Sequence, residues 1–439
     1  MRLPRRAVSI AVIFALPLAL FAAAPPAGAG EDLRESYQLL SATYYSRVDV
    51  QHLMDSVRDS LAESARKRGV RLTLPALHDS GNGGANVSAL SDAIALAQNA
   101  THESGVDLTY GAIEAMARSI GDRYTAFFTP DEFRKFNAAL DPEKISGIGV
   151  LIEPDPLTKY IRAYYVVPGT PAERAGLQTG DVFTAIDGVS TRNHNQESAS
   201  KLLRGNIGTA VHVQFERDGK AQPPLSITRS EVRPPTVIYK MLAQHVAYIW
   251  IMQFGRETPS EFSSALDRAQ RNDVRAYVID LRNDGGGYVS SALDISSKFV
   301  NSDPLLTIEQ RGAASETVDA QGHALPPRPM ALLVNRYTAS ASEITAGALQ
   351  DDGIAVLVGE KTFGKGVMQS LTQLPDGAAI KITTAHYLTP KNRDINLKGI
   401  EPDYTVTENK DARYGDVEHD SQLQAALTIL GKKIAQAKP

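Results

Sequence analysis

The spacing of apolar residues divides the chain into regions of different character. Between residues 30 and 140, apolar positions recur every three or four residues, as in YQLLSATYYSRVDVQHLMDSVRDSLAESARK and ALSDAIALAQNATHESGVDLTYGAIEAMARSIG. This period is typical of helices with one buried face. The sequence therefore predicts a helical N-terminal region, which carries no catalytic constellation and serves as structure or as an assembly surface.

After residue 140 the pattern changes twice. Residues 141–228 combine short alternating strands, glycine-rich turns and a short helix around PAERAGL. From 229 to 410, buried apolar strands such as HVAYIWIMQF, VRAYVIDLR and MALLVN alternate with helical segments such as SASEITAGALQDD. Such alternation indicates an α/β core. With 411–439 assigned to a C-terminal helix, the predicted fold class is α+β and multidomain.

Composition and charge exclude several classes of partner and of catalytic chemistry. Of 439 residues, 43% are hydrophobic and 22% are charged, which is typical of a soluble globular protein. A net charge of −4 argues against nucleic acid as the main partner. The chain has no cysteine, which excludes disulfides, thiol nucleophiles and cysteine metal sites. The nine histidines form no recognisable triad or metal motif, and we expect no metal or cofactor.

The first residues have the features of an export signal. Arg2, Arg5 and Arg6 precede the apolar run AVSIAVIFALPLALFAAA, and an A-x-A site follows. This pattern predicts a secretory signal at 1–29, cleaved after Ala29, with an uncleaved membrane anchor as the alternative. No later segment approaches the roughly 18 consecutive apolar residues that span a bilayer. We therefore expect a periplasmic or secreted protein, membrane-associated if the signal is retained.

Ser340 is the candidate nucleophile. It lies in TASASE, after the apolar run ALLVN and before the helical segment EITAGALQD. A serine at this point is either a helix N-cap or an exposed nucleophile on a strand-to-helix turn. A serine hydroxyl is a weak nucleophile and needs an adjacent base. A lysine can replace histidine in that role.

Lys365 is the candidate base, provided that it is neutral. Burial lowers the pKa of a lysine by up to about 3–5 units. Lys365 lies in the segment TFGKGVMQ, where Phe363 and Val367 supply apolar neighbours, although a solvated turn lysine is the alternative. If GVMQSLTQL is a strand, Gln369 points to the same face as Lys365. A neutral amide could hold the amine there without restoring its charge.

Acyl transfer also requires donors for the developing oxyanion. Ser340 and Ala341 begin a predicted helix, whose first amides are free and whose dipole favours an anion. The glycines of DLRNDGGGYVS follow the strand VRAYVIDLR and allow a second close approach of backbone amides. The alternative for this loop is a tight turn without a catalytic part.

Several segments occur in an order that resembles one known family. They are GDRYTAFFTPDEF, GIGV, TPAERAGLQTGDVFTAIDG, DLRNDGGG, TASASEITAGALQD, TFGKGVMQ, DGAAIKITTAHYLTP and KGIEPDY. In this order they resemble the carboxy-terminal processing peptidases, or tail-specific proteases, a family of serine peptidases with a PDZ domain. The resemblance covers nearly all of the chain after the signal, apart from an insertion around 65–105.

The resemblance implies a PDZ domain at 141–228 and a ClpP/crotonase-like α/β peptidase core at 229–410. It assigns the nucleophile to Ser340, the general base to Lys365 and the amide that orients the lysine to Gln369. The oxyanion donors would be Gly286 or Gly287, together with Ala341. The spacing of 25 residues from serine to lysine agrees with the family. Asp284 and Gly285 depart from the family's usual asparagine and proline.

The resemblance also implies how substrate is chosen. PDZ domains capture a C-terminal peptide by adding it as a strand, while backbone amides hold the terminal carboxylate. The loop with this role would be Gly147, Ile148, Gly149 and Val150, and its two aliphatic residues suggest an apolar pocket. The expected partners are protein substrates with apolar C-termini, and an adaptor protein or a homo-oligomer is compatible with the resemblance. The alternative is that the domain at 141–228 serves only as a structural spacer.

These observations favour a serine endopeptidase with a Ser-Lys dyad. A catalytically silent binding protein that keeps the PDZ domain is a second hypothesis, against which the joint presence of Ser340, Lys365 and Gln369 speaks. A different hydrolase on the same core is a third hypothesis. Activity on esters but not on peptides would favour that third hypothesis.

Overall fold

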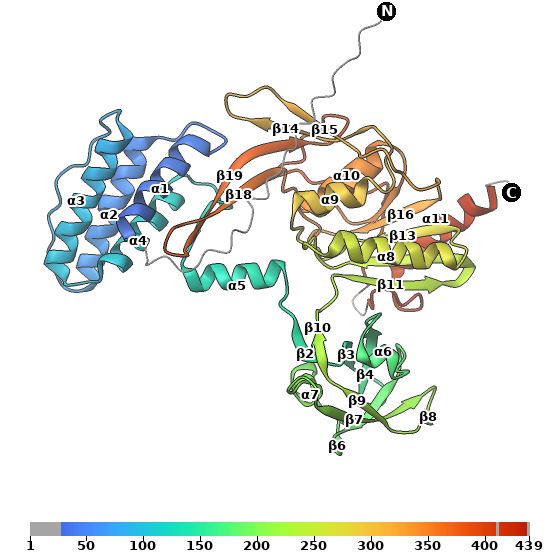
Figure 1. Ribbon diagram of the computed structural model, residues 1–439. Helices are drawn as coiled ribbons and strands as arrows, with labels where there is room; N and C mark the ends of the chain where they lie inside the picture. Colours follow the sequence, from blue (N-terminus) through green and yellow to red (C-terminus); the bar gives the residue numbers. More distant parts are fainter. Residues whose placement is uncertain (1–27, 410–411, 437–439) are drawn as a thin grey trace, which may run out of the picture.

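The computed structural model describes residues 28–409 and 412–436. The predicted signal segment 1–29 therefore lies outside the described residues, except for its last two positions. Figure 1 shows a helical body and a PDZ-like body, each joined to a central core. This arrangement confirms the predicted α+β multidomain fold. In the described ranges, no helix is both long and apolar enough to cross a membrane.

The N-terminal body is helical, as predicted. Its helices are α1 (Ala29–Thr43), α2 (Val50–Lys67), α3 (Gly83–Thr101) and α4 (Gly105–Ser119). Asp49, Asn82 and Ser104 cap the last three by accepting backbone N–H groups with their side chains. The predicted insertion around 65–105 includes α3, which completes the body. A short strand, β1 (Ala126–Phe128), and helix α5 (Pro130–Leu140) then lead towards the PDZ-like body.

The PDZ-like body is built around a mixed arrangement of short strands and helices. Its elements are β2 (Ile145–Gly147), β3 (Val150–Pro154), β4 (Ile161–Val166), α6 (Pro171–Arg174), β5 (Val182–Ile186), β6 (Val189–Ser190), α7 (Gln196–Leu203), β7 (Ala210–Arg217), β8 (Lys220–Ala221), β9 (Leu225–Thr228) and β10 (Ser230–Val232). Strands β2 and β10 pair antiparallel, across the predicted boundary at 228. We call this pair the stalk, because it carries the PDZ-like body below the core (Figure 1).

The core contains a sheet with the strand order β11-β12-β13-β16-β17-β20. Its strands are β11 (Val237–Leu242), β12 (Val246–Ile251), β13 (Ala276–Asp280), β16 (Met330–Val334), β17 (Val356–Gly359) and β20 (Tyr404–Thr405), with a 3-10 turn η1 (Ala243–His245). Helices α8 (Thr258–Arg271), α9 (Val289–Ser296) and α10 (Ala341–Asp351) pack on one face. The predicted C-terminal helix, α11 (Ser421–Gln436), packs on the other face.

The parallel strands of this sheet bring two loops together. Strands β12, β13, β16 and β17 run parallel, so their carboxyl ends lie at one edge. The loop after β13 and the turn after β16 therefore meet at that edge, where α/β proteins commonly place ligands. These are the segments DLRNDGGG and TASASE.

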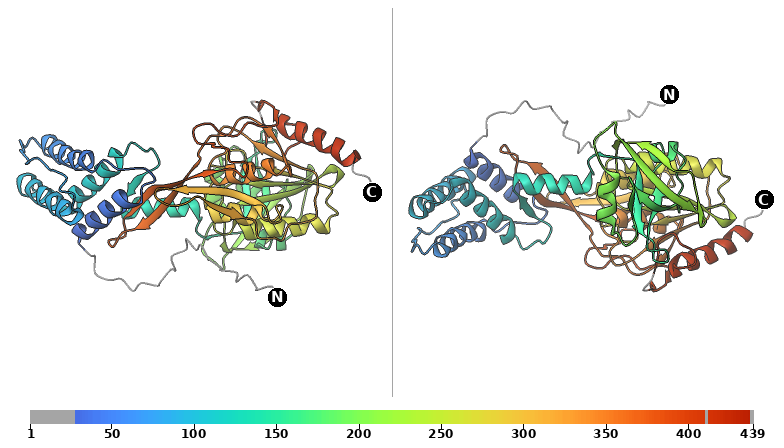
Figure 2. Two further views of the ribbon diagram at one scale, coloured as in Figure 1. Left: turned by 90° about the horizontal axis from the view of Figure 1, so that it is seen from above. Right: turned by 90° about the horizontal axis from the view of Figure 1, so that it is seen from below.

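A second sheet connects the core to the helical body. It contains β14 (Pro304–Gln310), β15 (Glu316–Asp319), β18 (Val367–Gln373) and β19 (Ala379–Leu388), with β1 on its edge. The hairpin β18–β19 extends from the core, and its outer residues Leu374, Ala378 and Ile380 pack among the helices (Figure 2). Lys365 lies just before the base of this hairpin.

Candidate active site

Ser340 has an unusual backbone conformation. It occupies the N-cap position of α10, with φ 57° and ψ −118°, and the residue is 9% exposed. An ordinary N-cap serine has an extended backbone. Non-glycine residues rarely adopt a positive φ, and such strain is concentrated at functional sites. The conformation therefore favours the nucleophile over the simple cap.

The loop after β13 holds the Ser340 turn in place through Asp284. The Asp284 carbonyl accepts the Ala339 N–H at 3.0 Å and the Ser342 hydroxyl at 3.1 Å. The Ser342 hydroxyl is therefore used to hold the turn. Gly286 packs directly on the turn, since a Cβ there would lie 2.7 Å from the Ala339 carbonyl oxygen and 2.8 Å from the Ala341 nitrogen. Only glycine permits this approach.

The hydrogen bonds of this loop narrow the choice of oxyanion donor. The Gly286 N–H already donates to Asp284 Oδ1 at 2.8 Å, so the prediction that Gly286 could serve is wrong for this geometry. The amides of Gly287 and Ala341 donate no hydrogen bond among the described residues. Gly287 has φ 151°, and a Cβ there would lie 2.2 Å from the Phe254 carbonyl oxygen. Gly287 and Ala341 are thus the candidate donors.

The sequence analysis missed Glu343, which joins the two candidate catalytic segments. Its Oε2 accepts the N–H of Ser340 at 3.0 Å and the N–H of Lys365 at 2.8 Å. Its Oε1 accepts the N–H of Gly364 at 2.7 Å and the hydroxyl of Thr362. Burial raises the pKa of Glu343, and these hydrogen bonds oppose that shift. The S-x-x-E spacing of a capping box is the signal that could have revealed it.

The amine of Lys365 is largely buried beside an aromatic ring and three charged side chains. Burial, and then the nearby charge of Lys381, lower its pKa to about 8, while Asp122 and Glu343 act in the opposite direction. The amine lies 5.0 Å from the centre of the Tyr124 ring. Lys365 is half-buried, so the structure favours the buried base over the solvated turn lysine, and its role as the base stays a prediction.

Two tyrosines that the sequence analysis did not select complete the surroundings of Lys365. The Tyr387 hydroxyl lies 3.2 Å from the Ser340 carbonyl oxygen and 2.8 Å from the Lys365 carbonyl oxygen. The Tyr124 hydroxyl is buried and has no hydrogen-bond partner among the described residues. Tyr387 therefore fixes the backbone of both candidate residues, while Tyr124 faces the lysine amine.

The candidate nucleophile, the candidate base and Gln369 are not hydrogen-bonded to one another in this state. Among the residues that the structure describes, no hydrogen bond joins Ser340 Oγ to Lys365 Nζ, and Gln369 Nε2 is buried without a partner. Strand β18 begins only at Val367, and its register shifts between Met368 and Gln369. Simple alternation from Lys365 to Gln369 therefore does not apply. Catalytic hydrogen bonds often form only with substrate bound, and the role of Gln369 stays a prediction.

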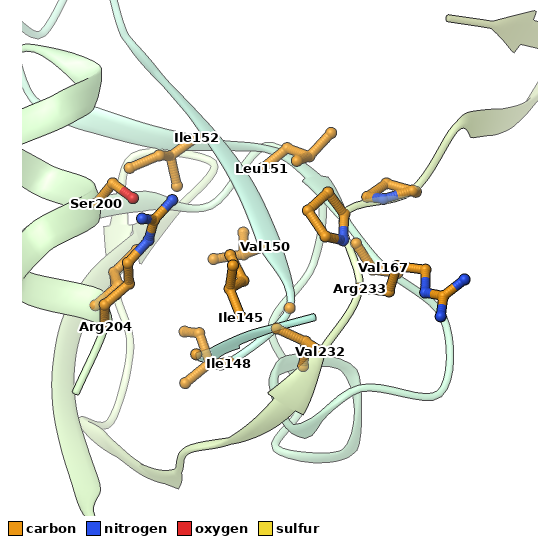
Figure 3. Close-up of a pocket in the computed structure, with 15 residues that line it drawn as sticks. Ile145, Ile148, Val150, Leu151, Ile152, Val167, Ser200, Arg204, Val232 and Arg233 are labelled. Carbon is orange, nitrogen blue, oxygen red and sulfur yellow. The ribbon is translucent and has the colours of Figure 1, made fainter. Parts of the chain in front are cut away.

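The GIGV loop lines a pocket of the PDZ-like body. Residues Gly147 to Val150 border it together with Ile152, Ser200 and Leu203, between β3 and α7 (Figure 3). Gly149 has φ 83°, and a Cβ there would overlap the Thr170 side chain. The amides of Ile148 and Gly149 donate no hydrogen bond among the described residues. The loop thus has free amides next to an apolar pocket, as the sequence predicted.

Comparison with known proteins decides the family. The model of peptidase family S41 matches residues 245–406, and a PDZ-domain model matches residues 162–217. The carboxyl-terminal-processing protease of Picosynechococcus sp. is 37% identical over 76% of this chain and 81% of its own. The carboxyl-terminal-processing protease of Synechocystis sp. is 36% identical over 75% of this chain and 78% of its own. The carboxy-terminal processing protease CtpA of Bacillus subtilis is 30% identical over 75% of this chain and 70% of its own. The chain belongs to peptidase family S41, the carboxyl-terminal-processing proteases.

One solved structure adds a likeness of fold. A lipoprotein from Streptococcus agalactiae aligns over 95% of this S41 peptidase and 100% of its own chain, with a TM-score of 0.50 and 11% identity. The photosystem II D1 C-terminal processing protease aligns over 93% of this chain and 99% of its own, with a TM-score of 0.49 and 24% identity. At 11% identity, the first likeness concerns the fold alone. The S41 chain is a serine-type peptidase with a PDZ domain.

In this S41 peptidase, Asp284 is expected to make stability depend on pH. Burial raises the pKa of Asp284 to about 8, against the opposing hydrogen bonds from Gly286 and Ser342. A raised pKa means that the folded state favours the neutral acid. Its stabilising contribution is therefore present below about pH 4 and is lost as the pH rises to about 8. A difference of one in pKa between the folded and unfolded states corresponds to about 1.4 kcal/mol.

Asp284→Asn is the matched variant, because an amide keeps the acceptor for the Gly286 N–H without ionising. We expect its free energy of unfolding, measured by urea titration, to fall less between pH 5 and pH 9 than that of the parent. The exposed Asp92→Asn serves as the control and should keep the parent's slope. Identical slopes for Asp284→Asn and the parent would contradict a neutral Asp284.

Proposed function

We propose that this protein is a periplasmic or secreted endopeptidase that selects substrates by their C-termini and cleaves them with a Ser340–Lys365 dyad. The observation that carries the proposal is the bridge through Glu343. One buried carboxylate binds the Ser340 amide and the Lys365 amide, next to the unpaired amides of Gly287 and Ala341. A nucleophile, a base of lowered pKa and oxyanion donors thus share one site.

The reaction follows from these positions. Neutral Lys365 takes the proton of Ser340 Oγ as that oxygen attacks the scissile carbonyl carbon. The resulting oxyanion accepts hydrogen bonds from the amides of Gly287 and Ala341. Lys365, now an ammonium, protonates the leaving amine, and an ester to Ser340 remains. Lys365 then activates a water molecule, which hydrolyses the ester and regenerates the serine.

A small rearrangement must precede this chemistry. The Lys365 amine has to move from the face of Tyr124 towards Ser340 Oγ, where Gln369 can hold it. Gln369 Nε2 and the Tyr124 hydroxyl have no hydrogen-bond partner within residues 28–409 and 412–436, which is consistent with a site that completes its hydrogen bonds when substrate is bound. The Glu343 bridge restricts the movement to side chains, because it fixes both backbones.

Substrate selection rests on the PDZ pocket. A C-terminal strand added to β3 would direct its carboxylate to the amides of Ile148 and Gly149 and its last side chain to the apolar pocket. The names of the relatives, carboxyl-terminal-processing proteases, support substrates of this class. The segment 1–29 supports export. An adaptor protein and self-association are compatible with the proposal and form no part of it.

The direct test uses the purified mature protein and an unfolded substrate with an apolar C-terminus. We expect cleavage of the native tail, and about tenfold or slower cleavage after the tail is amidated, because a charge-assisted hydrogen bond contributes about 1.5–3 kcal/mol. A terminal aspartate should also slow cleavage, since it brings a charge to an apolar pocket. Initial rates over a series of substrate concentrations provide the comparison.

Ser200→Trp should remove the preference, because Ser200 lines the pocket and the indole would fill it. Ser226→Trp, on exposed β9, is the control and should preserve the preference. Equal cleavage of native, amidated and aspartate-ended tails by the parent would rule out recognition of C-termini. It would leave the dyad chemistry intact.

A further inference from the structure

The stalk is held to the core at both of its ends. Its strands β2 and β10 pair from Ile145 with Val232 to Gly147 with Ser230. Figure 1 shows the stalk rising from the PDZ-like body towards the end of α5 on one side and β11 on the other. A displacement of the PDZ-like body must therefore act on the residues that anchor these two segments.

The incoming segment is anchored by Asp141. Its Oδ1 accepts the Arg256 N–H at 2.8 Å, and its Oδ2 accepts the Tyr288 hydroxyl at 2.8 Å. The Arg256 Nε lies 3.6 Å from the same Oδ2. Next to it, Gln253 Nε2 donates to the Leu140 carbonyl. One carboxylate thus joins the entry to the PDZ-like body with the segment before α8 and with Tyr288.

Tyr288 continues the loop that carries the candidate oxyanion donor. It directly follows Gly287, and its N–H donates to the Phe254 carbonyl at 2.8 Å. The Phe254 N–H in turn donates to the Gly286 carbonyl at 3.0 Å. Burial, and then Asp141, raise the pKa of Tyr288, so its hydroxyl keeps its proton and acts as a donor. Asp141 is therefore separated from the Gly287 amide by one side chain and one peptide unit.

The outgoing segment is fixed to the same part of the core. Arg233 Nη1 lies 2.8 Å from Glu257 Oε1. The N–H groups of Thr236 and Val237 donate to Glu261 Oε2 at 2.7 and 3.0 Å. A charged cleft of about 480 Å³, lined by Asp141, Lys144, Glu231, Arg233 and Arg256, lies between the two segments. Both segments are therefore anchored by polar contacts beside one cleft.

We propose that Asp141 is a positioning residue, which sets the orientation of the oxyanion loop through Tyr288. The inference rests on the proposed function, because it takes the Gly287 amide as an oxyanion donor. Asp141 contacts no substrate in this scheme. It acts by keeping Tyr288, and hence Gly287, in the geometry that the transition state requires.

A double-mutant cycle on the full-length mature protein tests the coupling. The variants are Asp141→Ala, Tyr288→Phe and their combination, assayed with a peptide too short to reach the PDZ pocket. We expect each single change to lower kcat about tenfold, because each removes the same charge-assisted hydrogen bond, with KM changed less than about twofold. The double variant should be no slower than the slower single variant. Asp141→Asn should recover most of the activity, because its amide can still accept from Arg256 and donate to Tyr288.

Two controls separate this role from a structural one. Lys144→Ala removes the stalk ion pair with Glu231, 2.7 Å long, without touching Tyr288, and should leave kcat unchanged. A fluorophosphonate probe reports separately on Ser340 and the oxyanion hole through the rate of covalent labelling. Labelling of the parent but unchanged rates in both single variants would overturn the coupling, as would losses that multiply in the double variant. No labelling of the parent at Ser340 would instead count against the proposed function.

Discussion

Replacing Ser340 with alanine is expected to abolish proteolysis, with a loss of at least about 10³-fold in kcat, while the protein stays folded. The hydroxyl is the attacking atom in the proposed reaction, so its removal prevents formation of the acyl-enzyme at this residue. The Ser340 amide, which donates to Glu343, remains in the variant, so the bridge to Lys365 is kept. Cleavage of an unfolded protein, followed by gel electrophoresis and mass spectrometry, measures the effect.

Ser342→Ala is the matched control for this variant. Ser342 lies two residues later and is also buried, and its hydroxyl donates to the Asp284 carbonyl without reaching the lysine loop. We expect it to lower thermal stability modestly and to keep most of the activity. Turnover by Ser340→Ala comparable to that of the parent, in preparations free of other proteases, would falsify the assignment of the nucleophile.

Lys365→Arg is expected to be as inactive as Lys365→Ala, with a comparable loss of about 10³-fold or more. Arginine keeps the positive charge but cannot be deprotonated in a protein, so it cannot accept the serine proton. A substantial residual activity of the arginine variant would make Lys365 an electrostatic or structural residue. The comparison is made at saturating substrate, where kcat reports the chemical step.

The pH dependence provides an independent check on the same lysine. The base must be neutral, so kcat/KM should rise with pH through about 8, the value to which burial and Lys381 lower the pKa of Lys365. Lys381→Met removes the neighbouring positive charge, so the pKa of Lys365 should rise and the acidic limb should move to higher pH. If the acidic limb of the pH profile did not move in Lys381→Met, the charge of Lys381 would not affect the pKa of Lys365.

Glu343 would keep the proposed Ser340–Lys365 site rigid before substrate binds. The turn after β16 and the segment before β18 belong to different sheets, and a single carboxylate binds the amides of both. The hydroxyl of Tyr387, from β19, lies between the carbonyl oxygens of Ser340 and Lys365. These contacts fix the backbone of the candidate site, so the proposed reaction requires only the side chains of Lys365 and Gln369 to move.

Much of the fold and the identity of the candidate residues could be read from local patterns. The three- and four-residue periodicity predicted the helical body, because burial of one helix face dictates that spacing. Buried strands alternating with helices predicted the α/β core. TASASE and TFGKG could be recognised because a strand-to-helix serine and a glycine-flanked lysine are local features. The ordered motifs also indicated the family.

The tertiary structure decided which groups contact one another. The occupied amide of Gly286 and the register shift before Gln369 could not be read from spacing, because both depend on hydrogen bonds formed after packing. Glu343 has the pattern of an ordinary helix residue until the Lys365 loop is placed beside it. Asp141 and Tyr288 lie far apart in the chain and meet only because α5 delivers the stalk to the end of β12. Spacing and chemical type are local properties of the sequence, whereas partners distant in the chain are selected by the packing of whole elements.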